Sequence, residues 1–100
     1  MREYELYLVI DPDAEEEQIS ALLDRVHTLV AQGDGQTPGQ VIKVDRRGKR
    51  RLAYPIRKKL EGQDVILNFQ TPPQALPELE RFLKLSESVL RYLLVRTDED

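Results

Sequence analysis

Cysteine is absent from this sequence of 100 residues, and histidine occurs once. Without cysteine the chain has no disulfide framework and no thiolate metal site, which fits a reducing cytosol. A single histidine also makes zinc ligation implausible, because structural zinc sites take four protein ligands. That residue, His27, lies off the apolar stripe of a predicted helix, so we expect a solvated surface side chain and no bound metal.

Long hydrophobic runs are also missing. No apolar stretch approaches the roughly 20 residues of a membrane-spanning helix. The first five residues, Met-Arg-Glu-Tyr-Glu, carry charges where a signal peptide needs its apolar segment. We therefore expect a cytoplasmic protein with no membrane partner. The length fits one domain, residues 1–100, and 40% hydrophobic residues can supply its core.

Charge is distributed unevenly along the chain, although the net charge is only −3. Residues 46–59 hold eight basic residues and no acidic one, which gives +8. The rest of the chain holds 7 basic and 18 acidic residues, which gives −11. Because the local field decides where a polyanion docks, the basic segment is a candidate nucleic-acid contact. The alternative interpretation is a solvated basic hairpin with counterions.

Two periodicities divide the chain into six elements. Apolar residues alternate in four segments, as on strands that bury one face. The predicted strands are residues 3–10, 41–57, 64–70 and 89–96. Apolar residues recur with helical spacing in two further segments, and the predicted helices are residues 15–30 and 75–84. The acidic tail, residues 97–100, is expected to fray.

Capping and turn residues mark the boundaries of these elements. Asp13 is the expected cap of the first helix, with a glutamate three residues later completing a capping box. Thr71 is a candidate cap of the second helix. Residues 59–62 are the expected turn between the second and third strands. Gly48 predicts a bulge in the second strand, and Pro55 predicts a sheet edge, because proline cannot donate a ladder hydrogen bond.

The element order β-α-β-β-α-β predicts an α+β, ferredoxin-like fold. In that fold a four-stranded antiparallel sheet carries both helices on one face, with right-handed crossovers and with the first and third strands in the centre. The opposite face is too apolar to be meant for water alone, so we expect a docking surface there. Its expected members are Tyr7, Val9, Ile66, Asn68, Arg91, Leu93 and Val95.

Catalytic signatures are weak, and we expect no enzyme, no cofactor and no small-molecule substrate. The serines have no evident base, and the glycine-rich residues 33–35 follow a helix instead of preceding one. Two rival functions of the same fold remain open. An acylphosphatase-like enzyme needs an arginine-lined anion loop and a positioned asparagine, but Asn68 lies in a strand. A ligand-binding regulatory domain has no reason to carry the basic segment.

One stretch, Gly48-Lys-Arg-Arg-Leu-Ala-Tyr-Pro-Ile56, closely resembles the signature of bacterial small-subunit ribosomal protein six. The opening Arg2-x-Tyr-Glu with its following Asp-Pro break, and the ending over residues 89–96, are similar to that family too. The resemblance covers essentially the whole chain. It implies binding to the central domain of small-subunit ribosomal RNA, paired with small-subunit ribosomal protein eighteen, without catalysis or a cofactor.

The basic segment, the open sheet face and the resemblance together give the candidate site residues. The expected RNA-binding residues are Arg2, Arg46, Arg47, Lys49, Arg50, Arg51 and Arg91. The expected partner-binding residues are Tyr7, Val9, Tyr54, Ile66 and Leu93. Tyr54 has a second interpretation, in which its ring packs in or beside the core.

Overall fold

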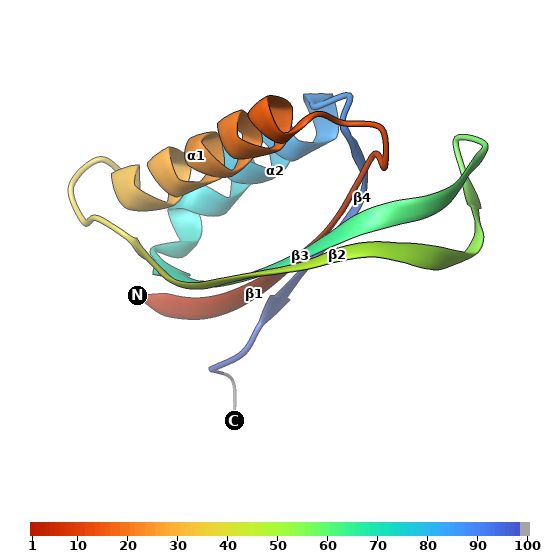
Figure 1. Ribbon diagram of the computed structural model, residues 1–100. Coiled ribbons are helices and arrows are strands. Elements are labelled where there is room, and N and C mark those ends of the chain that lie inside the picture. The colour runs from red at the N-terminus through yellow and green to blue at the C-terminus, as the bar shows by residue number, and fades with distance from the viewer. Residues whose placement is uncertain (99–100) are drawn as a thin grey trace.

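A computed structural model describes residues 1–98 of the chain. Four strands, two α-helices and one 3₁₀ turn follow each other in the predicted order (Figure 1). The elements are β1 (Arg2–Ile10), α1 (Glu16–Gln32), β2 (Gln40–Ile56), β3 (Lys59–Thr71), the 3₁₀ turn Pro73–Ala75, α2 (Leu76–Leu85) and β4 (Val89–Arg96).

The four strands form one antiparallel sheet in the order β2-β3-β1-β4. This order confirms that the first and third strands are central and that the proline-bearing β2 lies at an edge. Figure 1 shows α1 and α2 side by side on one face of the sheet. The predicted α+β, ferredoxin-like arrangement is therefore confirmed. Below, the sheet face without helices is called the open face.

The core lies between the sheet and the helices. Along β1 the alternate residues Tyr4, Leu6, Leu8 and Ile10 are buried, which is the face that the period-two pattern predicted. Six apolar residues of α1 at helical spacing pack against them. Phe69 of β3 is fully buried and stacks on Tyr4, with 5.5 Å between the ring centroids.

The prediction that Asp13 caps the first helix is wrong. The N-cap is Glu15, and the backbone N–H of Glu15 donates to the Gln18 side chain in a capping box. Asp13 is occupied elsewhere: its carboxylate pairs with Lys59 at 2.6 Å, and its N–H donates to the side chain of Asp11. Asp13, which the local pattern assigned to the helix cap, is thus held in an ion pair with a residue far away in the sequence.

The prediction that Thr71 caps the second helix is also wrong. Thr71 is the last residue of β3 and is fully buried, and its hydroxyl donates to the carbonyl oxygen of Val30 at 3.2 Å. Two prolines follow, and the second of them begins a 3₁₀ turn, Pro73–Ala75, that separates Thr71 from α2. Pro77 lies in the first turn of α2, where its missing N–H costs nothing.

The turn between β2 and β3 lies at Arg57 and Lys58, so the prediction of a turn at 59–62 is wrong. Both turn residues have positive φ, 50° and 66°, as in a two-residue type I′ hairpin. Gly62 lies within β3 and not in the turn. Glycine is needed there because β3 passes close to β1. A Cβ at this position would lie 2.4 Å from Cγ1 of Val9. The predicted bulge is present, with a register shift between Arg46 and Gly48.

The type I′ turn gives a first prediction. Lys58→Gly is expected to raise the free energy of unfolding by about 1 kcal/mol, because glycine adopts positive φ without the penalty that a side chain carries. The matched control is Lys49→Gly, in the regularly paired stretch of β2 from Gly48 to Arg51, which is expected to lower it by about 0.5–1 kcal/mol. Urea unfolding measures both. Destabilisation of equal size in the two variants would contradict the assigned turn.

Thr97 and Asp98 follow β4 along the edge of the sheet. The N–H of Thr97 donates to the carbonyl oxygen of Glu3 at 2.9 Å, and Asp98 pairs with Arg96 at 2.8 Å. The rest of the predicted frayed tail, residues 99–100, lies outside the described residues. Within residues 1–98 no helix is long and apolar enough to cross a membrane.

Candidate functional site

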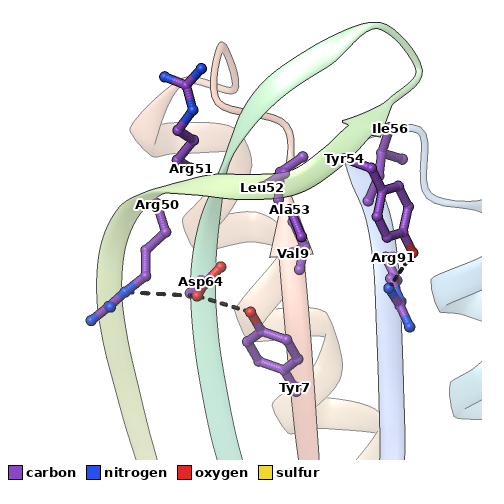
Figure 2. Close-up of a pocket in the computed structure, with 10 residues that line it drawn as sticks. All are labelled: Tyr7, Val9, Arg50, Arg51, Leu52, Ala53, Tyr54, Ile56, Asp64 and Arg91. Carbon is purple, nitrogen blue, oxygen red and sulfur yellow. Dashed lines mark hydrogen bonds and ion pairs between the residues drawn. The ribbon is translucent and has the colours of Figure 1, made fainter.

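The basic segment, residues 46–59, forms the outer part of β2, the turn and the first residue of β3 in the long β2–β3 hairpin, and is called here the basic hairpin. Its β2 arm crosses the open face from one edge of the sheet toward the other (Figure 2). There Nη1 of Arg91 in β4 donates to the hydroxyl of Tyr54 at 2.7 Å. Nη1 of Arg57 at the tip donates to the carbonyl oxygen of Glu87 at 2.8 Å. Two contacts therefore fix the hairpin over one end of the sheet.

Some cations of the basic hairpin are already paired within the protein. Both terminal nitrogens of Arg46 donate to the carboxylate of Glu16, at 2.6 and 2.8 Å, and this lowers the pKa of Glu16. Nε of Arg50 lies 3.8 Å from the buried Asp64, and Lys59 pairs with acidic residues before α1. Within residues 1–98, four exposed hairpin cations have no hydrogen bond or ion pair: Arg47, Lys49, Arg51 and Lys58.

A cavity of about 210 Å³ lies between the basic hairpin and the open face. Tyr7, Val9, Asp64 and Arg91 line it from the sheet, and residues 50–54 and Ile56 line it from the hairpin. The hydroxyl of Tyr7 donates to Oδ2 of Asp64 at 2.9 Å (Figure 2). Burial is the main cause that raises the pKa of Tyr7 above its ordinary 10.0, and this hydrogen bond is the second cause. Tyr7 is therefore a hydroxyl donor at neutral pH.

The open face consists of rows that cross β4, β1 and β3. The row nearest the hairpin joins Arg91, Val9 and Asp64, and Val9 is only 3% exposed because the hairpin covers it. The next row joins Leu93, Tyr7 and Ile66, and Leu93 is 52% exposed. The far row contains Val95, which is 46% exposed. The apolar surface that a partner can reach is thus the half of the face away from the hairpin.

The structure brings together most of the predicted site residues. Tyr54 is 58% exposed, so the interpretation that it packs in the core is wrong. Arg91 contacts the basic hairpin through its hydrogen bond to the hydroxyl of Tyr54. Arg2 does not lie near the basic hairpin, because it is opposite Thr71 in the β1–β3 register, at the other end of the sheet. His27 is exposed on α1, as predicted.

Sequence reasoning missed Asp64, which is 5% exposed and lines the cavity. It shares a face with Ile66 and Asn68 by the period-two pattern, and this was the available signal. Its proximity to Tyr7 and Arg50 follows from strand pairing, which no local pattern reports. Among residues 1–98 no group of three histidine or acidic side chains is arranged to hold a metal ion.

The Tyr7–Asp64 hydrogen bond gives a second prediction. The pKa of Tyr7 is raised in the folded state. The stabilisation that this tyrosine contributes is therefore fully present below pH 10 and is lost as the pH rises through the folded-state pKa. Tyr7→Phe is expected to cost about 1–2 kcal/mol at pH 7, because a buried carboxylate loses its donor, and to flatten the decline above pH 10. Urea unfolding from pH 7 to 11 measures this, with Tyr54→Phe as the control. An equally steep alkaline decline in both variants would contradict it.

Comparison with known proteins agrees with this geometry. Residues 3–96 match the family described as Ribosomal protein S6. The chain belongs to the ribosomal protein S6 family. The small ribosomal subunit protein bS6 of Acidothermus cellulolyticus is 48% identical over 98 residues, 98% of each chain. That of Caldanaerobacter subterraneus is 42% identical over 99 residues, 99% of this chain and 100% of the relative.

A solved structure agrees as well. The crystal structure of 30S ribosomal protein S6 from Thermotoga maritima has a TM-score of 0.84 and 32% identity, covering 96% of this chain and 87% of the other. The S6 family consists of structural ribosomal proteins and is not enzymatic. Membership therefore removes the acylphosphatase-like rival, and the fold alone no longer has to decide between functions.

Proposed function

We propose that the protein is a structural constituent of the small ribosomal subunit in the bacterial cytoplasm. It binds the central domain of small-subunit ribosomal RNA together with small-subunit ribosomal protein eighteen. The observation that carries this proposal is the basic hairpin: four exposed cations without an internal partner project from one two-stranded arm. Unpaired cations of this kind contact phosphates and release counterions, which contributes affinity independent of sequence.

The two halves of the proposed interface lie side by side. The basic hairpin carries Arg47, Lys49 and Arg51 for RNA, while Arg46 is engaged by Glu16 and is expected to contribute less. The exposed half of the open face offers Leu93, with Ile66 and Tyr7 beside it, to the protein partner. A partner docked there would add its own surface next to the hairpin.

Chemical footprinting of central-domain RNA tests the proposal. The RNA is probed alone, with protein eighteen, and with protein eighteen plus this chain. The expected result is a set of protections that requires this chain and disappears when the four unpaired cations are replaced by glutamine. Protections that are identical with and without the chain would overturn the proposed function.

A further inference from the structure

The cavity under the basic hairpin has a chemistry that counterion release does not use. Its lining includes the rings of Tyr7 and Tyr54, the side chains of Arg50 and Arg91, and one buried carboxylate, whereas the guanidinium group of Arg51 points away (Figure 2). A site built for phosphate alone has no use for a carboxylate, which repels anions. At about 210 Å³ the cavity is smaller than the roughly 300–1,000 Å³ of pockets for drug-sized ligands, so it suits a single ring system.

We propose that this cavity binds the base of one unpaired nucleotide of the RNA, and that it selects a base with an exocyclic amino group. Such a nucleotide carries the three features that the wall complements: amino donors on the base edge, a flat π-face and a flanking phosphate. This inference rests on the proposed RNA-binding function and names the part of the RNA that the hairpin reads.

Asp64 supplies the acceptor for the amino group. The residue is 5% exposed, and within residues 1–98 its Oδ1 has no hydrogen-bond partner. Oδ2 accepts one hydrogen bond, from Tyr7, while Nε of Arg50 at 3.8 Å is too distant to donate another. A carboxylate accepts about four hydrogen bonds, so capacity remains after Tyr7 is satisfied. Asp64 lines the cavity, so its carboxyl group borders the space that a base would enter.

Tyr54 and the arginines supply the stacking face and the phosphate contacts. The ring of Tyr54 is 58% exposed, and its hydroxyl accepts from Arg91, which fixes the ring at the mouth of the cavity. Arg50 and Arg51 line the same cavity and are exposed. Bases stack on tyrosine rings and on guanidinium planes in single-stranded RNA recognition.

Two other occupants fit the wall less well. A lysine or arginine side chain of a protein partner would meet the guanidinium groups of Arg50 and Arg91 beside one carboxylate, a net positive site. A carboxylate or free phosphate would meet Asp64 and leave its acceptor capacity unused. A nucleotide satisfies both signs of charge at once, because its base edge donates and its phosphate accepts.

The test uses the full chain and seven-nucleotide single-stranded RNAs, with binding followed by amide chemical shifts in NMR at low salt. The strands are all-uridine, the same strand with one central cytidine, and the same strand with one central abasic site. Uridine lacks the amino group. The cytidine strand is expected to bind about tenfold more tightly than the uridine strand, the gain from one hydrogen bond to a charged acceptor. Equal affinity for the two strands would overturn the inference.

Asp64→Asn is expected to abolish the cytidine preference, because the amide can turn a donor toward the cavity. The matched control, Glu61→Gln, makes the same change of charge on the same strand, β3, outside the cavity and is expected to keep the preference. A preference that survives Asp64→Asn would contradict the role of this carboxylate. Thermal melting checks that each variant is folded.

Tyr54→Ala keeps the test decisive if Asp64→Asn does not fold, since Tyr54 is an exposed residue. Loss of the stacking face is expected to cost about tenfold in affinity for the cytidine strand, and Tyr54→Phe is expected to retain it. Equal binding by the alanine variant and the parent would overturn the inference. Free cytidine monophosphate that binds as tightly as the strand would overturn the assignment to RNA. If the chain protects central-domain RNA but the short strands show no base preference, this inference is refuted and the proposed function stands.

Discussion

Replacing five cations of the basic hairpin with glutamine is expected to flatten the salt dependence of RNA binding. The five are Arg46, Arg47, Lys49, Arg50 and Arg51. If roughly five phosphates are neutralised, the logarithm of the affinity falls with the logarithm of salt at a slope near −4. The parent complex then loses about a hundredfold or more between 50 and 200 mM salt, and the variant loses far less.

Single substitutions separate the cations of the hairpin by their surroundings. Arg51→Gln is expected to reduce the magnitude of the slope by about 1, because Arg51 has no ion pair within residues 1–98. Arg46→Gln is expected to change it less, because Glu16 already neutralises that guanidinium. The control outside the hairpin is Arg25→Gln on α1. Filter binding at five salt concentrations, with protein eighteen present, gives each slope. An unchanged slope in the fivefold variant would mean that the hairpin faces away from the RNA.

The elements that depend on local sequence were predictable. The alternation Tyr4, Leu6, Leu8 and Ile10 gives a buried strand face, and the structure buries all four. The edge position of β2 follows from Pro55, and the bulge follows from Gly48 with its φ of 80°. In each case one residue or one period carries the physical cause, so no knowledge of distant contacts is required.

The features that depend on distant contacts were not predictable. Gly62 marks a turn by composition, yet the structure needs glycine there because β3 passes over Val9. The actual turn uses Arg57 and Lys58 at positive φ, which these residue types rarely adopt. Crossing of the open face by the hairpin depends on the contact between Tyr54 and Arg91, residues 37 positions apart. Tertiary contacts decided all three features, against local preference.

The same crossing explains why the open face divides into two parts. Near the hairpin Val9 is covered, whereas Leu93 and Val95 on β4 are half exposed. Exposed apolar residues on this edge strand, beside the half-buried Tyr7 and Ile66 of the central strands, favour a docked partner in the assembled state. The hairpin therefore leaves one end of the sheet for a protein and offers its own cations to RNA.

This chain is expected to bind central-domain RNA poorly alone and at least about a hundredfold more tightly with protein eighteen. Outside residues 46–59 its charge is −11, so much of its surface repels a polyanion. One hairpin offers few contacts against that repulsion and against the entropy lost on docking. A partner on the open face would contact RNA beside the hairpin, and the second contact would then be effectively intramolecular.

A matched pair of substitutions tests this cooperativity at the surface that carries it. Leu93→Asp, on the open face, is expected to leave the affinity of the chain alone unchanged and to remove most of the gain from protein eighteen. Leu85→Asp makes the same change on α2, where the side chain is 72% exposed, and is expected to keep the gain. By linkage, RNA should tighten the protein pair by the same factor that the partner tightens RNA, which calorimetry of the pair with and without RNA measures.

The decisive experiment is a titration of central-domain RNA at one fixed salt concentration, with the chain and then with the chain plus protein eighteen. Equal affinity in the two titrations would refute the cooperative binding, because the repulsion from the acidic surface would then need no partner to overcome it.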